Sequence, residues 1–372
     1  MDAVGQISFF VALILVIVIH EAAHYGVARA FDIKVTEFFV GFGPKIWSKR
    51  RGETEVGFKW IPAGGYVKIA GMNPFEEVPP EDLPRTYGAK PRWQRALVIV
   101  AGPATHFVLA FLCFALWLGF VGQPTSRSPE ILVVPERLEG EVSPAFAAGL
   151  RAGDRIVAVG DVNDATSEYL VAQTQERLGE PLTLTVERNG RTFTVEVVPV
   201  LTQDGEEQVA RIGVVLGDGL RETSGPVGAI TGGGRLVGEN LVSTVNSLGR
   251  VFGPEGVGRI FQLIFTDAPR DEGDPASVVG VGRIAGSIAS GETGSFWDIL
   301  FLFGLVNVFV GFLNLLPLPP FDGGHLAVLA IEKIRGKPVD MRKVIPVSAA
   351  VAAFFIVFTI AVVYVDLVKP PV

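Results

Sequence analysis

The chain has 372 residues, of which 49% are hydrophobic and 19% are charged, so it is too apolar for an ordinary soluble domain and too polar for a bare bundle of membrane helices. Its net charge of -7, without a long basic run or zinc-finger spacing, argues against a nucleic-acid-binding protein. The single cysteine, Cys113, cannot form an intramolecular disulfide. We therefore expect a protein of the lipid bilayer that carries a soluble insert.

The first apolar segment, Ser8 to Phe31, is predicted to be a membrane span. The residues before it carry no positive charge, and no small-residue cleavage site followed by polar sequence ends it, which argues against a cleavable signal peptide. About 20 residues cross a bilayer, so the segment is long enough to span it.

This segment contains the motif His20-Glu21-Ala22-Ala23-His24. His20 and His24 lie one helical turn apart on the same face, so both imidazoles can reach a single Zn²⁺, and Glu21 lies beside them, where it can act on a water molecule. On a soluble helix two such histidines are often surface residues. Within an apolar span, however, polar groups are costly unless they serve a site, so the motif predicts a zinc metalloprotease.

The loop from Asp32 to Arg95 is polar and basic, and the positive-inside rule places it in the cytoplasm with the amino terminus outside. Two runs in it are strand-like, Glu55 to Ile61 and Tyr66 to Ile69, and Pro62-Ala63-Gly64-Gly65 between them is typical of a turn. We predict a β-hairpin close to the membrane. Gly64 and Gly65 could present an edge to an extended peptide, and a plain structural loop is the alternative.

A second apolar run, Ala96 to Val121, is predicted to cross back outward. It contains His106, and a histidine within the membrane is a candidate functional residue. Because His106 has no metal-ligand spacing to His20 or His24, we expect a neutral, hydrogen-bonded group near the site, with a ligand role as the alternative.

Residues 123–218 have the composition of a soluble domain. The predicted elements are a short helix, a Gly-Asp turn and a strand in Ser143 to Val159, a helix at Tyr169 to Leu178, and strands Thr183 to Arg188 and Thr192 to Val198. The two strands are joined by the hairpin turn Asn189-Gly190. This order resembles a PDZ domain, which implies a peptide-binding module, and a small β-rich spacer is the alternative.

Residues 219–295 are rich in glycine and valine and show apolar residues at helical spacing, for example Leu236, Leu241 and Leu248. Such helices either lie on the outer membrane surface or pack on the membrane core, and the pattern does not choose between these.

A third span, Phe296 to Leu316, leads into Asn314-Leu-Leu-Pro-Leu-Pro-Pro-Phe-Asp322-Gly-Gly-His325, where prolines and glycines break the helix. Irregular backbone at membrane depth is tolerated only where it lines a protein cavity, so Asp322 is predicted as the third zinc ligand and His325 as its competitor. Two histidines and a carboxylate leave the fourth zinc position open, as in catalytic sites. A second basic loop and a fourth span, Val344 to Leu367, follow.

The H-E-x-x-H motif, the Gly-Phe-Gly-Pro and Ile-Pro-Ala-Gly-Gly-Tyr-Val-Lys loop, the PDZ-like insert and the Asp-Gly-Gly-His motif, in this order, resemble the site-2 protease family of intramembrane zinc metalloproteases. The resemblance implies that His20, His24 and Asp322 bind zinc and that Glu21 is the catalytic base. It also implies that Asn314 contacts the substrate backbone. The chain departs from the family where His106 replaces an asparagine of many relatives, and in having one PDZ domain where some relatives have two.

Together these features predict a polytopic α-helical membrane protein with four transmembrane helices, a cytoplasmic membrane-associated β-hairpin and one extracytoplasmic PDZ domain. The expected regions are 1–122, with spans one and two and the hairpin; 123–218, the PDZ domain; 219–295, the amphipathic linker; and 296–372, with spans three and four. The active site is expected near the cytoplasmic side of the cell inner membrane.

By resemblance, the substrates are single-span membrane proteins already trimmed by another protease, such as anti-sigma factors, and remnant signal peptides. One rival hypothesis is a zinc-binding PDZ scaffold without proteolytic activity, which would not need Glu21 or an open fourth zinc position. A membrane metalloprotease of another kind is the second rival, and it gives no reason for the PDZ insert or for the distant Asp322 motif.

Overall fold

The computed structural model describes residues 2–204, 207–271, 274–290 and 296–369. The chain forms two compact units: the first combines Met1–Trp117 with Pro226–Val372, and the second is Leu118–Gly225. The second unit is therefore an insert between two halves of the first.

Among the described residues, four helical stretches are long and apolar enough to cross a membrane, as predicted. They are α1 (Asp2–Ala30), α2 (Arg92–Leu116, continued by a π-helical turn at Trp117–Val121), α8 (Ile299–Leu315, preceded by a 3-10 turn at Phe296–Asp298) and α10 (Ile345–Val368, preceded by a 3-10 turn at Met341–Lys343). The described residues of this unit also form the α-helices α5 (Pro226–Val251), α6 (Pro254–Phe265), α7 (Val278–Ser290) and α9 (Asp322–Arg335).

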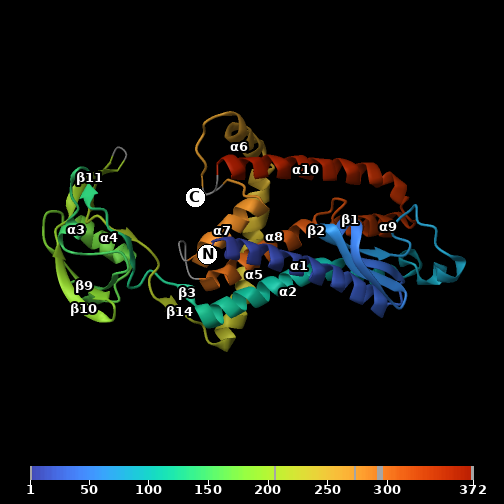
Figure 1. Cartoon of the computed structure of the whole chain (residues 1–372), viewed down its shortest axis with the longest axis horizontal. Coiled ribbons are helices and arrows are strands. Elements are labelled where there is room, and N and C mark those ends of the chain that lie inside the picture. Colours follow the sequence, from blue (N-terminus) through green and yellow to red (C-terminus); the bar gives the residue numbers. More distant parts are fainter. Residues whose placement is uncertain (1, 205–206, 272–273, 291–295, 370–372) are drawn as a thin grey trace. The chain divides into compact units, whose positions relative to one another are not determined.

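Helix α2 is the centre of the first unit, because α1, α5 and α8 all pack against it (Figure 1). Two glycines of α8 allow a close approach: a Cβ at Gly304 would overlap the ring of Phe114, and one at Gly311 would lie 2.9 Å from Cβ of His106. Small residues at such contacts are typical of membrane helix packing.

The sequence left open whether α5 lies on the membrane surface or packs on the membrane core, and the structure shows that it packs on the core. Its Leu236, Val237 and Leu241 pack around Ala110 and Phe114 of α2. This part of α5 therefore packs against α2.

The loop between α1 and α2 forms two long strands, β1 (Val35–Arg51) and β2 (Thr54–Ile69), and here the predicted turn is wrong. The tight turn lies at Gly52, with a φ of 62°, and Pro62 to Gly65 lie inside the continuous strand β2. Proline and glycine are common in turns, but here they lie where the hairpin folds over on itself.

The register shows this folding directly. Phe38 pairs with both Val67 and Val56, and Trp47 pairs with Phe58. The two strands therefore make a sheet of four segments in the order 47–51, 54–58, 35–40 and 65–69, and segment 65–69 lies at one edge.

The second unit is built around an antiparallel sheet of order β10-β9-β7-β8. The helices and the strands of this sheet are α3 (Pro144–Ala147), β7 (Arg155–Val159), β8 (Val162–Asn163), α4 (Ser167–Glu176), β9 (Leu182–Arg188) and β10 (Arg191–Val197). Short strands complete it: β3 (Gln123–Pro124), β4 (Ile131–Val133), β5 (Arg137–Leu138), β6 (Glu141–Val142), β11 (Val200–Asp204), β12 (Glu207–Arg211), β13 (Val215–Leu216) and β14 (Arg221–Glu222).

The predicted helices and strands of this unit are confirmed in order, including the turn at Asn189 and Gly190, where both residues have positive φ. Alternate apolar residues of β9, from Leu182 to Val186, form its core with Ile156 and Val159 of β7 and Leu170 of α4.

Candidate metal centre

Three side chains from α1 and α9 converge on one point of the first unit. Nε2 of His20 lies 3.1 Å from Nε2 of His24, and Oδ2 of Asp322 lies 3.3 and 3.4 Å from these two atoms. Both histidines are buried. Within the described ranges, these three residues are the only group of histidine, cysteine or acidic side chains placed to share a metal ion.

The arrangement fits zinc. Zinc bonds of about 2.0 to 2.1 Å in a tetrahedron place neighbouring ligand atoms about 3.3 to 3.4 Å apart, close to the three distances here. Oδ2 of Asp322 is buried and accepts no hydrogen bond within the described part of the chain, and such an atom is costly unless a cation balances it.

The backbone of α2 leaves space beside this triangle. A Cβ at Gly102 would lie 2.6 Å from Cε1 and 2.7 Å from Nε2 of His20, and it would overlap Nε2 of His24. Any side chain here would occupy the space around the two imidazole nitrogens, so glycine is required by the site.

Asp322 is aimed by a break between two helices. Helix α8 ends at Leu315, the chain passes a cis peptide bond at Pro319-Pro320, and α9 begins at Asp322. A Cβ at Gly323 would overlap the carbonyl oxygens of Leu315 and Leu316, so the first turn of α9 lies directly on the end of α8. Glycine after Asp322 is therefore required by the close packing of α9 on the end of α8.

A buried ion pair ties α9 to α2. Nη1 of Arg95 lies 2.9 Å from Oε2 of Glu332, and the other carboxylate oxygen of Glu332 accepts a hydrogen bond from the backbone N–H of Val339. Glu332 is only 4% exposed. Because α9 carries Asp322 at its start and α2 packs against both histidines, this pair joins the two helices that surround the candidate site.

Glu21 lies next to the edge segment of the sheet. A Cβ at Gly65 would lie 3.1 Å from Cγ of Glu21 and 3.2 Å from the carbonyl oxygen of Phe39. The predicted peptide-binding edge and the motif glutamate are therefore neighbours. The other predicted glycine, Gly64, has a φ of 148° and packs against the ring of Phe42.

The remaining predicted residues lie around this group. His106 is not in it, but its Nε2 lies 3.0 Å from Nδ1 of His20. His325 is also outside it and lines a separate cavity of about 210 Å³ with Met72 and Met341. Asn314 lies in the last turns of α8, half-buried, and its side chain makes no hydrogen bond to any described residue.

Sequence reasoning missed Gly102, Asn307 and the Arg95–Glu332 pair. Asn307 carried a signal, because it is an amide in the middle of the apolar α8. Gly102 and the ion pair carried none, because their roles depend on contacts between helices that are distant in sequence.

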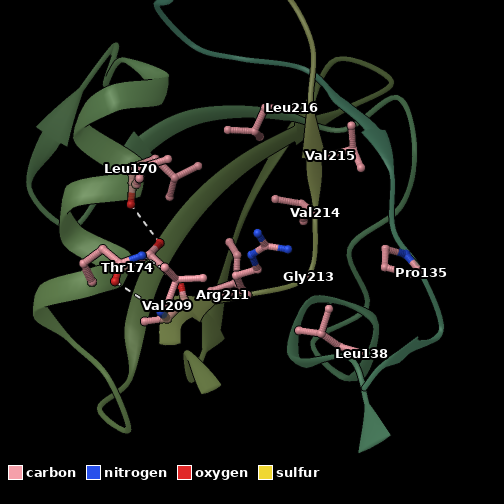
Figure 2. Close-up of a pocket in the computed structure, with 14 residues that line it drawn as sticks. Pro135, Leu138, Leu170, Thr174, Val209, Arg211, Gly213, Val214, Val215 and Leu216 are labelled. Carbon is pink, nitrogen blue, oxygen red and sulfur yellow. Dashed lines mark hydrogen bonds between the residues drawn. The ribbon is translucent and has the colours of Figure 1, made fainter. Parts of the chain in front are cut away.

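The second unit has its own cavity, of about 560 Å³, between α4 and the segment from Val209 to Leu216 (Figure 2). Leu170 and Thr174 of α4 lie opposite this segment. Gln175 bridges the two sides, since its amide donates to the carbonyl of Ala210 (3.0 Å) and accepts from the N–H of Ala210 (3.1 Å). The lining is mainly apolar, so the cavity suits apolar side chains.

Comparison with known proteins agrees with this geometry. A model of peptidase family M50 matches residues 8–359. The zinc metalloprotease Rip1 of Mycobacterium tuberculosis is 34% identical over 408 residues, covering 100% of this chain and 98% of the relative. Metalloprotease MmpA of Caulobacter vibrioides is 30% identical over 376 residues, covering 90% of this chain and 87% of the relative. The chain therefore belongs to peptidase family M50, the site-2 proteases, and is a zinc metalloprotease of the membrane.

Proposed function

We propose that this enzyme cleaves single-span membrane proteins within or close to the bilayer, with His20, His24 and Asp322 as zinc ligands and Glu21 as general base. The observation that carries the proposal is the convergence of three ligand atoms, two of them on α1, a helix apolar enough to span a membrane, and the third an oxygen of Asp322 that accepts no hydrogen bond from the described residues. A ligand set of three leaves one position open, which suits catalysis.

When bound, zinc supplies a Lewis acid that polarises the scissile carbonyl. Glu21 accepts the proton of the attacking water molecule and delivers it to the leaving amine. The Nδ1 atoms of His24 and His20 each lie within hydrogen-bonding distance of a group of α2, which keeps the Nε2 atoms of both rings directed at the site.

We propose that the substrate binds as an added strand along segment 65–69. In a helix the carbonyls are bonded to N–H groups four residues on, so a substrate helix must unwind before hydrolysis. Segment 65–69 pairs with 35–40 on one side, and no other described strand pairs with its second side. Because Gly65 lies against Glu21, a peptide added there would pass close to the base. The amide of Asn314, which makes no hydrogen bond to the described residues, is a candidate for a further backbone contact.

The inserted unit is proposed to be a PDZ domain that selects substrates. Its cavity lies between a helix and a strand, the place where peptides bind by strand addition, and apolar residues such as Leu170 and Leu216 line it. The described residues of the unit include no histidine and no metal-binding group, so it has no catalytic role in this proposal.

The substrates proposed are single-span regulators of the anti-sigma-factor type, trimmed first by another protease, and remnant signal peptides. The basic loops favour a cytoplasmic location for the β1–β2 sheet and an external one for the insert. A tag at Gly88 should therefore be protected in intact cells, and a tag at Gly190 should be reachable from outside. Reversed accessibility would refute this orientation.

The experiment that tests the chemistry separates zinc binding from cleavage. Glu21→Gln keeps the size of the side chain and all three ligands but removes the base, so zinc content should stay and cleavage of a single-span reporter should stop. His24→Ala and Asp322→Ala should lose zinc, because two remaining ligands hold the ion poorly. A Glu21→Gln variant with normal cleavage, or an Asp322→Ala variant with full zinc, would refute the assigned roles. Zinc retained with no cleavage in the unaltered protein would favour the scaffold hypothesis.

A further inference from the structure

One face of α2 lies directly against the two zinc-site histidines. Val98, Gly102 and His106 follow each other at four-residue spacing, as do His20 and His24 on α1. Val98 contacts His24, His106 contacts His20, and Gly102 leaves the space between them. The Nδ1 atoms of both imidazoles therefore face this stripe of α2.

For His24 the proton position follows from one contact. Its Nδ1 lies 2.7 Å from the carbonyl oxygen of Val98. A carbonyl oxygen only accepts, so Nδ1 carries the proton and Nε2 keeps its lone pair for a metal ion.

For His20 the contact alone is ambiguous, because Nδ1 lies 3.0 Å from Nε2 of another imidazole, His106. Either nitrogen could be the donor. Which nitrogen donates depends on the contact that the other ring nitrogen of His106, Nδ1, makes.

Asn307 of α8 sets it. Its amide nitrogen donates to the carbonyl oxygen of Phe303 (2.9 Å), which directs its Oδ1 toward Nδ1 of His106, 3.1 Å away. That oxygen only accepts, so Nδ1 of His106 carries the proton and its Nε2 is an acceptor. His20 must then donate from Nδ1, and its Nε2 is left with the lone pair that zinc requires.

Burial makes this relay rigid. His106 is 2% exposed and Asn307 is 1% exposed, and Gly311 of α8 packs directly against Cβ of His106. In such surroundings a broken hydrogen bond cannot be replaced by one to water. The relay from His20 through His106 and Asn307 to the carbonyl of Phe303 therefore has one arrangement in which all its hydrogen bonds are made.

We propose that His106 and Asn307 are positioning residues of the zinc site, which hold His20 in the tautomer and orientation that bind the ion. The inference rests on the ligand assignment proposed above. A purely structural role, in which the relay only joins α2 to α8, predicts a different result: lower stability of the metal-free protein with unchanged zinc affinity.

The test measures the zinc dissociation constant of the purified full-length protein against a competing chelator, together with the melting temperature of its metal-free form. His106→Leu and Asn307→Leu should weaken zinc binding by about 10- to 100-fold, as loss of an outer hydrogen-bond partner does in metal sites. His106→Gln should stay within about threefold of the unaltered protein, because its amide can both accept from His20 and donate to Asn307.

Asn240→Leu is the matched control. Asn240 of α5 also donates its amide to the carbonyl four residues before it, at 2.8 Å, and among the described residues no hydrogen bond joins it to a histidine. It should leave zinc affinity unchanged. Unchanged affinity in His106→Leu, or equal loss in His106→Gln and His106→Leu, would overturn the inference while Asp322→Ala still loses zinc. Full zinc in Asp322→Ala would overturn the ligand assignment and the relay with it.

Discussion

Substitution of Gly102 by alanine should exclude zinc while leaving the protein folded. The added methyl carbon would lie 2.6 and 2.7 Å from two atoms of the His20 ring and closer still to His24. Relative to an ordinary contact of about 3.5 Å, the neighbouring atoms must move by about 0.8 to 1.3 Å. Zinc sites tolerate displacements of about 0.2 Å in ligand distance. We therefore expect zinc affinity to fall by at least the roughly 100-fold that loss of an outer partner costs.

The effect on folding is expected to be small by comparison. Alanine stabilises a helix interior by about 1 kcal/mol relative to glycine, and overpacking costs about 1 to 3 kcal/mol. The net loss should therefore not exceed about 2 kcal/mol. Chelator competition, reporter cleavage and helical circular dichroism would be measured on the same purified protein.

Gly26→Ala is the matched control, because Gly26 lies in α1 two residues after His24 and a Cβ there would meet no atom of the described residues within 4 Å. It should keep both zinc and cleavage. If Gly102→Ala bound zinc as tightly as the unaltered protein, the space beside α2 would not be needed by the ion.

Three further outcomes are expected. Glu332→Ala leaves the Arg95 guanidinium partly buried without its partner, so it should lower the free energy of unfolding by about 3 kcal/mol and reduce zinc occupancy. If the Glu332→Ala variant and the unaltered protein had the same melting temperature, this expectation would be wrong. Deletion of residues 127–216 should keep cleavage of pre-trimmed substrates and lose discrimination against untrimmed ones; complete inactivity of a stably inserted deletion would give the insert a catalytic role. Burial alone would raise the pKa of Asp154, but the Arg188 guanidinium holds it below the ordinary 3.8, so the insert should lose stability as pH falls below that value, and Asp154→Asn should remove this dependence in acid unfolding curves.

Much of the candidate site could be predicted from the sequence, because its central features are local. His20 and His24 are one helical turn apart whatever surrounds them, and an apolar span of about 20 residues is a membrane candidate by composition alone. The break before Asp322 follows from proline and glycine in a short stretch. The turn at Asn189-Gly190 was equally local, since those residues favour positive φ.

Tertiary structure decided what depends on contacts between distant segments. Pro62 to Gly65 are a turn by local preference, yet pairing of 35–40 with two parts of β2 makes them the bend of a folded-over hairpin. Helix α5 could lie on a membrane or pack on its neighbours, and only the shape of α2 and α8 determined which. Two consecutive hydrogen bonds, His20 to His106 and His106 to Asn307, join residues that are 287 positions apart, counted from 20 to 307. No local pattern could therefore predict the direction of these bonds.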